Sequence, residues 1–195
     1  DKGTSGLEAT KLHNKMGIRA SITGELNFSN VKVTDWNIVG ELNKGFYYAM
    51  EFFDKTRVGV AAQAVGMAQG AWEIAFKYAK QREAFGMPIM QHEAIGVTLA
   101  EMATKIEAAR LLTYKAAGLV DAGKLDAMAT AMAKYYAGHV AMEVTNNAIQ
   151  TLGGYGYFGE YRVEKYHRDA KITEIYEGTS EIQRLQVLKY LLSKY

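Results

Sequence analysis

The sequence contains no cysteine and only one proline among its 195 residues. Without cysteine there are no disulfides, no thiolate metal ligands and no cysteine nucleophile, which is compatible with a reducing compartment. Proline interrupts helix interiors. A chain with so little of it, and with abundant Ala, Met, Leu, Glu and Lys, is therefore suited to long helices.

Long uncharged apolar runs and a strong net charge are also missing. Charges interrupt the candidate helices every few residues, so no transmembrane span is expected. A net charge of +2 gives no broad basic field for nucleic acid or an anionic membrane surface. The polar start lacks the apolar run of a signal peptide and has no initial Met. We therefore expect a cut or processed start, with cytoplasm as the default compartment.

The first 40 residues differ in pattern from the remainder. Short runs with alternating or β-branched character extend from Leu7 to Leu12, from Ile18 to Ile22 and from Leu26 to Val33. They predict two or three antiparallel strands. Such a small sheet cannot easily bury its apolar face alone. We therefore expect residues 1–40 to be the end of a larger β domain.

From Gly45 onward, apolar residues recur at three- and four-residue steps, which is typical of amphipathic helices. Breaks are expected near Pro88, Gly123 and Gly153, and two shorter helices over Glu160–Ala170 and Ser180–Lys194. Residues 41–195 are thus predicted to form a mainly α domain, an antiparallel bundle of four or five helices. The predicted buried stripes are Val58, Ala62, Val65, Ala68/Gln69, Trp72, Phe76 and Ala79; Ile95, Leu99, Met102, Ile106, Ala109, Thr113 and Ala116; and Ala127, Ala131, Lys134/Tyr135, His139, Met142, Thr145/Asn146 and Ile149.

One segment places a carboxylate beside a helix start. Ser180 with Gln183 fits a capping box, which predicts a helix N-terminus there. Glu177 lies just before it and follows the apolar side chains of Ile175 and Tyr176. A carboxylate desolvated by such neighbours is suited to act as a general base. The alternative is a solvated Glu before an ordinary capped helix.

Two other segments carry arginine. Arg82 ends a predicted helix shortly before Phe85 and Gly86, which suits a phosphate clamp because a guanidinium can hold two oxygens. The alternative is a surface arginine favoured by the helix dipole. Asp54 and Arg57 stand three residues apart, and an ordinary ion pair is the default interpretation.

A glycine-rich segment follows the third long helix. Gly153, Gly154 and Gly156 allow a ligand to approach the backbone closely, although an ordinary helix terminus explains them equally well. The four histidines are scattered and have no metal-ligand spacing, so no metal site is expected.

Taken together and in this order, five segments resemble the acyl-CoA dehydrogenases, with the medium- and short-chain members most similar. The resemblance extends over essentially the whole chain. It implies that residues 1–40 end that family's middle β domain and that residues 41–195 form its C-terminal helical domain. The segments are Phe53-Asp54-Lys55-Thr56-Arg57, Arg82-x-x-Phe85-Gly86, Gln150-x-Leu152-Gly153-Gly154-x-Gly156, Arg168-Asp169-Ala170-Lys171-Ile172 and Ile175-Tyr176-Glu177-Gly178-Thr179.

The resemblance implies FAD as cofactor, an acyl-CoA thioester as substrate and Glu177 as the catalytic base. Some relatives carry the base at the position of Thr56, which cannot serve as one here. Positions on the substrate side are Asp54, Arg57, Tyr176 and Gly178. Positions implied to contact FAD, with Gln150 to Gly154 reaching it from a neighbouring subunit, are Arg82, Glu83, Ala84, Phe85, His92, Glu93, Gln150, Leu152, Gly153, Gly154, Thr179 and Glu181.

The sequence departs from the family pattern at Ala84, Glu93 and Glu181. Carboxylates beside an anionic cofactor are unfavourable unless they face its hydroxyl groups, so Glu93 and Glu181 would contact FAD only through such groups.

The resemblance further implies a homodimer or homotetramer and an electron-transferring flavoprotein as electron acceptor. The family's N-terminal domain and first half of the β domain have no counterpart in this sequence, so we expect a fragment with half a flavin site. Two alternatives remain: a related acyl-CoA oxidase, and a non-catalytic helical oligomerisation module of the same fold.

Overall fold

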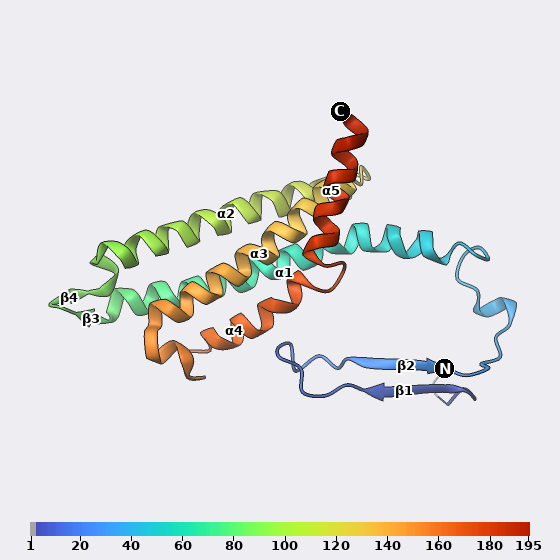
Figure 1. Ribbon diagram of the computed structural model, residues 1–195, viewed down its shortest axis with the longest axis horizontal. Helices are drawn as coiled ribbons and strands as arrows, with labels where there is room; N and C mark the ends of the chain where they lie inside the picture. Colours follow the sequence, from blue (N-terminus) through green and yellow to red (C-terminus); the bar gives the residue numbers. More distant parts are fainter. Residues whose placement is uncertain (1–2) are drawn as a thin grey trace. The chain divides into compact units, whose positions relative to one another are not determined.

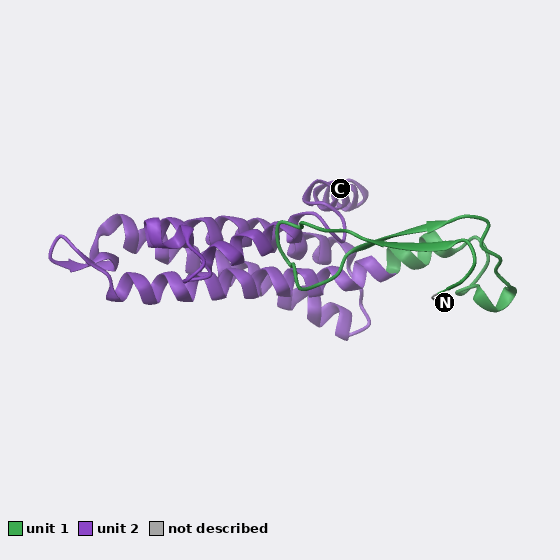
Figure 2. Ribbon diagram, turned by 90° about the horizontal axis from the view of Figure 1, so that it is seen from below, with its two compact units in different colours: residues 1–51 green, residues 52–195 purple. Residues whose placement is uncertain are grey.

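The computed structural model describes residues 3–195 and consists of two compact units, residues 1–51 and residues 52–195 (Figure 2). The boundary falls within the long helix α1 (Gly45–Gln81), which begins in the first unit and continues through the second. All the candidate catalytic and cofactor residues belong to the second unit.

The first unit contains one two-stranded antiparallel sheet. Strand β1 (Leu7–Lys11) pairs with β2 (Gly24–Phe28), so that Leu7 lies opposite Phe28. A short 3-10 helix, η1 (Asp35–Asn37), follows. The prediction of two or three antiparallel strands is met by two.

The predicted strand run from Ile18 to Ile22 is wrong, and so is the extension of the last strand to Val33. Ile18–Ile22 forms part of the loop that joins β1 to β2. Lys15 holds this loop by donating from Nζ to the carbonyl of Ile18 (2.8 Å) and to Thr23 Oγ1 (3.2 Å). Hydrogen bonds from a side chain to nearby backbone thus replace strand pairing, which alternating hydrophobicity alone cannot reveal.

The second unit is a helical bundle in which α1, α2 and α3 run side by side and α4 lies along them (Figure 1). This confirms the predicted mainly α, antiparallel bundle. The elements after α1 are β3 (Glu83–Ala84), β4 (Met87–Pro88), η2 (Ile89–Gln91), α2 (Glu93–Asp121), α3 (Ala127–Leu152), η3 (Gly153–Tyr157), α4 (Val163–Ala170), η4 (Lys171–Glu174) and α5 (Ser180–Lys194).

Alanine dominates the core of this bundle. Small side chains let helices approach closely, and larger side chains of α2 such as Leu99 fill the remaining space. Trp72 joins two helices by donating from Nε1 to the carbonyl of Leu99 (2.9 Å). Two residues of the predicted buried stripes are exposed instead. They are Ala62 in α1 and His139 in α3. The buried residues of α1 are Arg57, Val60, Ala61, Ala64, Val65, Ala68, Ala71, Ala75 and Ala79.

The helix boundaries follow from local chemistry. Asp126 caps α3 by accepting hydrogen bonds at Oδ1 from the backbone N–H of Met128 (2.9 Å) and of Ala129 (3.1 Å). Gly123, with φ +68°, follows the end of α2. Helix α4 begins at Val163, later than the predicted Glu160, whereas α5 has the predicted bounds. Among residues 3–195, no helix is long and apolar enough to cross a membrane.

Candidate active site and cofactor cavity

A tight turn between η4 and α5 presents Glu177. Glu177 has φ +58° and Gly178 has φ +92°, so two consecutive residues adopt left-handed backbone. Such a conformation is strained by about 1–3 kcal/mol at a non-glycine residue. A Cβ on residue 178 would lie only 2.5 Å from Gln183 Nε2, so a larger residue there would displace this amide as well as strain the backbone. The surrounding side chains must therefore hold this turn in place.

The capping residue of α5 differs from the prediction. Thr179, not Ser180, is the N-cap, and its Oγ1 accepts from the backbone N–H of Ile182 (3.4 Å). Ser180 Oγ instead donates to the carbonyl of Glu174 (3.4 Å). Both Thr and Ser make good caps. The left-handed turn before the helix shifts the cap by one residue, which the sequence pattern did not show.

The half-buried Glu177 carboxylate faces α1. Its Oε2 accepts a hydrogen bond from Thr56 Oγ1 at 2.5 Å. The residue proposed as base and the position where some relatives carry theirs therefore meet across the bundle. A hydroxyl donor fixes one carboxylate oxygen and leaves the other free for a second partner.

Behind the carboxylate lies a buried ion-pair network on α1 and α5. Arg57, 5% exposed, pairs with Asp54 as its spacing predicted, and its Nη1 also donates to Gln186 Oε1 (2.7 Å). Gln186 Nε2 donates to Asp54 Oδ1 (3.3 Å). Arg57 Nε reaches the carbonyl of Glu177 at 3.4 Å. The default interpretation of a simple pair is thus confirmed, and the structure extends that pair to the Glu177 turn.

Two residues that the sequence analysis did not select hold the same turn. Lys134 Nζ donates to the carbonyl of Gly178 at 2.6 Å, and its side chain is fully buried. Gln183 Nε2 donates to the carbonyls of Glu177 and Gly178, each at 3.1 Å. A signal was present for Lys134, because this lysine falls on the buried stripe of α3. Gln183 had been assigned to a capping box instead.

The two residues before Glu177 differ in how far they are exposed to solvent. Ile175 is 48% exposed, so the desolvation expected from it is not found. Tyr176 is half-buried, and its hydroxyl donates to Gln63 Oε1 on α1. Burial raises the pKa of Tyr176, the hydrogen bond to Gln63 opposes that rise, and the charge of Glu177 adds to it. Tyr176 therefore stays protonated as a donor near neutral pH.

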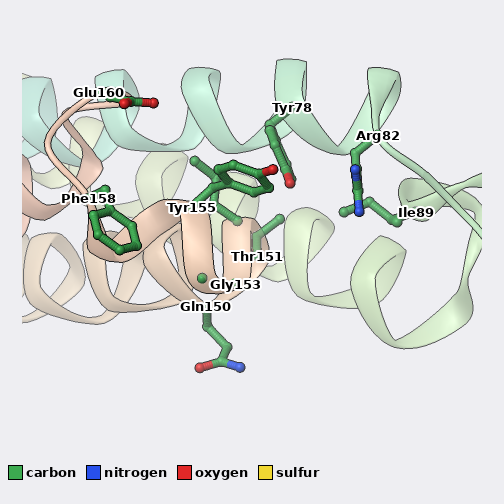
Figure 3. A pocket seen from close by; sticks show the side chains of 11 residues that line it. Tyr78, Arg82, Ile89, Gln150, Thr151, Gly153, Tyr155, Phe158 and Glu160 are labelled. Carbon is green, nitrogen blue, oxygen red and sulfur yellow. The ribbon is translucent and has the colours of Figure 1, made fainter.

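A cavity of about 640 Å³ lies towards the other end of the bundle. The end of α1 and the end of α3 bring together Arg82, Gln150, Leu152, Gly153 and Gly154, all residues that the resemblance assigned to FAD. Tyr78 and Tyr155 also line it, with ring centroids 6.4 Å apart. Figure 3 shows Tyr78 and Arg82 extending from α1 towards Tyr155 and Ile89.

The cavity is lined by a guanidinium, a side-chain amide and glycine backbone. No atom lies within 4 Å of where a Cβ would stand on Gly153 or Gly154, so a ligand can approach the main chain there. Arg82 is exposed, and a guanidinium can hold two phosphate oxygens at once. This donor set suits a pyrophosphate.

Several residues expected to contact FAD lie outside that cavity. Glu83, Ala84 and Phe85 form the β3–β4 hairpin, whose turn has left-handed Phe85 (φ +53°) and Gly86 (φ +82°). Phe85 is 94% exposed, with its ring edge-on to His92 at 6.0 Å. His92 Nε2 lies 3.0 Å from the carbonyl of Ala84 and ties the hairpin to the start of α2.

The two unexpected carboxylates both lie at helix N-termini. Glu93 is the first residue of α2 and Glu181 lies in the first turn of α5, where the helix dipole favours negative charge. Hydrogen bonds from its own backbone N–H and from the Thr179 hydroxyl lower the pKa of Glu181. Thr179 and Glu181 thus belong to the Glu177 turn rather than to the cavity around Arg82.

The turn and the cavity are well separated. Arg57 lies beside the Glu177 turn and Gln81 beside the cavity. At 1.5 Å per residue these two positions of α1 are roughly 36 Å apart along the helix. Within residues 3–195, no cluster of three or more His, Cys, Asp or Glu could hold a metal ion.

Residues 43–192 match the family model of the acyl-CoA dehydrogenase C-terminal domain. The rat mitochondrial short-chain specific acyl-CoA dehydrogenase is 47% identical over 98% of this chain and 47% of its own length. The caffeyl-CoA reductase–Etf complex subunit CarC of Acetobacterium woodii is 44% identical over 100% of this chain and 51% of its own.

The solved butyryl-CoA dehydrogenase of Megasphaera elsdenii superimposes with a TM-score of 0.95 at 48% identity, covering 98% of this chain and 50% of that one. The chain therefore spans about half the length of the relatives it matches. With the family model matching most of its residues, the chain belongs to the acyl-CoA dehydrogenase family.

Proposed function

We propose that this chain is the C-terminal part of an FAD-dependent acyl-CoA dehydrogenase in which Glu177 removes the α-proton of an acyl-CoA thioester. The observation that carries the proposal is a half-buried carboxylate held by Thr56 on a strained, tightly bonded turn. FAD, when bound, supplies the acceptor for the hydride that leaves the β-carbon.

The residues around Glu177 divide the remaining work. Thr56 holds one carboxylate oxygen, which leaves the other to receive the proton. Asp54 and Arg57 stiffen the wall behind the turn and, with Tyr176 and Gly178, form the substrate side of the site. Gly178 allows the left-handed backbone that sets where the base lies.

The cavity at the other end would hold the pyrophosphate and adjoining part of FAD. Arg82 supplies charge-assisted hydrogen bonds, Gln150 an amide, and Leu152, Gly153 and Gly154 the floor. The hairpin residues Glu83, Ala84 and Phe85, with His92 and Glu93, would flank the same cofactor, and Thr179 and Glu181 of a neighbouring copy would meet its other end.

A separation of roughly 36 Å along α1 is longer than one dinucleotide can bridge. The cavity of one chain therefore completes the flavin site beside Glu177 of a second copy, which requires a homodimer or homotetramer.

We further propose that residues 1–40 end a larger β domain of a longer protein. An electron-transferring flavoprotein is proposed as electron acceptor, in keeping with the Acetobacterium relative named as a subunit of a reductase–Etf complex.

The test is the anaerobic visible spectrum of the full-length protein before and after addition of acyl-CoA thioesters. The flavin absorption is expected to bleach. Glu177→Gln should keep the flavin and slow bleaching at least ~10³-fold, within the range for loss of a general base. Glu107→Gln, which removes an exposed carboxylate of α2 paired with Arg110, is the matched control and should bleach normally. Rapid reduction of Glu177→Gln would rule out Glu177 as the base.

A further inference from the structure

Lys134 is a buried ammonium in an alanine-rich helix. Its side chain is fully buried on α3, where Ala131, Ala133 and Ala137 are buried as well. Removing an ammonium from water costs several kcal/mol unless strong partners compensate. Its Nζ donates to a neutral carbonyl, that of Gly178, at 2.6 Å. An uncharged side chain would serve the packing of α3 better, so the charge needs another explanation.

Lys134 completes a set of donors that holds both carbonyls of the base-bearing turn. The Glu177 carbonyl receives Arg57 Nε (3.4 Å) and Gln183 Nε2 (3.1 Å). The Gly178 carbonyl receives Gln183 Nε2 (3.1 Å) and, at the shortest distance of the set, Lys134 Nζ. Because peptide units are planar, fixing two successive carbonyls fixes the backbone that directs the Glu177 side chain.

We propose that Lys134 is a positioning residue for the base: by holding the Gly178 carbonyl, its ammonium keeps the left-handed turn in the one conformation that directs the Glu177 carboxylate at the substrate's α-carbon. This inference rests on the proposed function of Glu177 and assigns a role to a side chain that does not itself touch the substrate.

The electrostatic surroundings give this role a pH signature. Burial, and then the positive charge of Arg57 on α1, lower the pKa of Lys134 to about 8. Glu174 on η4, Glu177 on the turn and Glu181 on α5 oppose that decrease. The ammonium therefore loses its proton as pH rises past about 8, and the rate of proton abstraction is expected to fall there.

Folding stability changes in the opposite direction. The pKa of Lys134 is about 8 in the folded chain against 10.5 in the unfolded chain. Between these values the unfolded chain binds more protons, so this group makes stability rise with pH across that window. A rate that falls while stability rises separates positioning of the base from a purely structural role.

The experiment uses the full-length protein with FAD bound and measures the rate of flavin bleaching by a saturating acyl-CoA, anaerobically, from pH 6.5 to 9.5. Lys134→Met should keep the flavin and slow bleaching ~10- to 100-fold, as expected for a misplaced reacting group. The apparent Kd for acyl-CoA should change less than ~3-fold. The decrease in bleaching rate near pH 8 should disappear. Lys105→Met, which removes a partly exposed lysine of α2 paired with Glu143, is the matched control and should behave as wild type.

Two outcomes would overturn the proposal: a Lys134→Met rate and pH profile equal to those of wild type, or loss of flavin and lower stability with an unchanged rate per bound flavin. If Lys134→Met does not fold, the wild-type profile decides, since a fall near pH 8 with flavin retained supports the role and a flat profile overturns it. Wild-type flavin that no acyl-CoA reduces would instead reject the proposed function itself.

Discussion

The two regions of the helical unit that are proposed to carry function are built in opposite ways. The Glu177 turn is half-buried, strained and held by side chains from α1, α3 and α5. The cavity around Arg82 is open, lined by an exposed arginine and by glycines with free space around them. The position of a base relative to the reacting atom must be set to within a fraction of an ångström, and many contacts are needed to hold it there. A cofactor-binding surface needs complementary donors and access, so its residues contribute little to the fold.

The largest loss of stability is expected when Arg57 is removed from the buried ion-pair network. Arg57→Met leaves Asp54 without its cationic partner and should lower the free energy of unfolding by about 3 kcal/mol, as expected when one member of a buried pair is lost. Urea denaturation measures the change. The control is Arg110→Met, whose pair with Glu107 is more exposed, at 28% and 55% of the two side chains, and contributes at most about 1 kcal/mol. Equal losses would remove the distinction between a structural network and a surface pair.

Glycine substitutions give an intermediate contrast. Gly178→Ala adds a Cβ 2.5 Å from Gln183 Nε2 at a residue with φ +92°, and should cost about 2 kcal/mol of stability from backbone strain. Gly154→Ala has free space and should change stability by less than about 0.5 kcal/mol. Thermal unfolding of the two variants makes the comparison. A similar loss in both would mean that the space around the glycines does not decide their role.

The smallest effect on the fold is expected at the cavity arginine. Arg82→Ala should leave stability within about 0.5 kcal/mol of wild type, because the side chain is exposed. Its affinity for FAD should nevertheless fall ~10- to 100-fold, through loss of a charge-assisted hydrogen bond. Titration of the apoprotein with FAD measures the affinity. Lys80→Ala removes the same charge from the same helix end without lining the cavity, and unchanged binding is expected. Equal weakening in both would indicate only a general electrostatic attraction.

Local pattern was a good guide wherever local interactions decide the structure. The scarcity of proline and the apolar periodicity predicted the three long helices, and the bounds of α5 agree with the structure. Hydrophobic periodicity failed where side-chain hydrogen bonds or a left-handed turn set the backbone instead. The run at Ile18–Ile22 became a loop held by Lys15, and the cap of α5 shifted from Ser180 to Thr179.

By itself, the sequence determined the helical bundle, the order of the five motifs and the family to which they belong, because periodicity, helix breakers and residue types are properties of the chain. Only the tertiary structure decided that Thr56 meets Glu177, that Lys134 and Gln183 hold the turn, and that Arg82 shares a cavity with Gly153. These contacts join residues far apart in the sequence. They depend on how helices pack and on which buried polar groups find partners, and neither is encoded in any single segment.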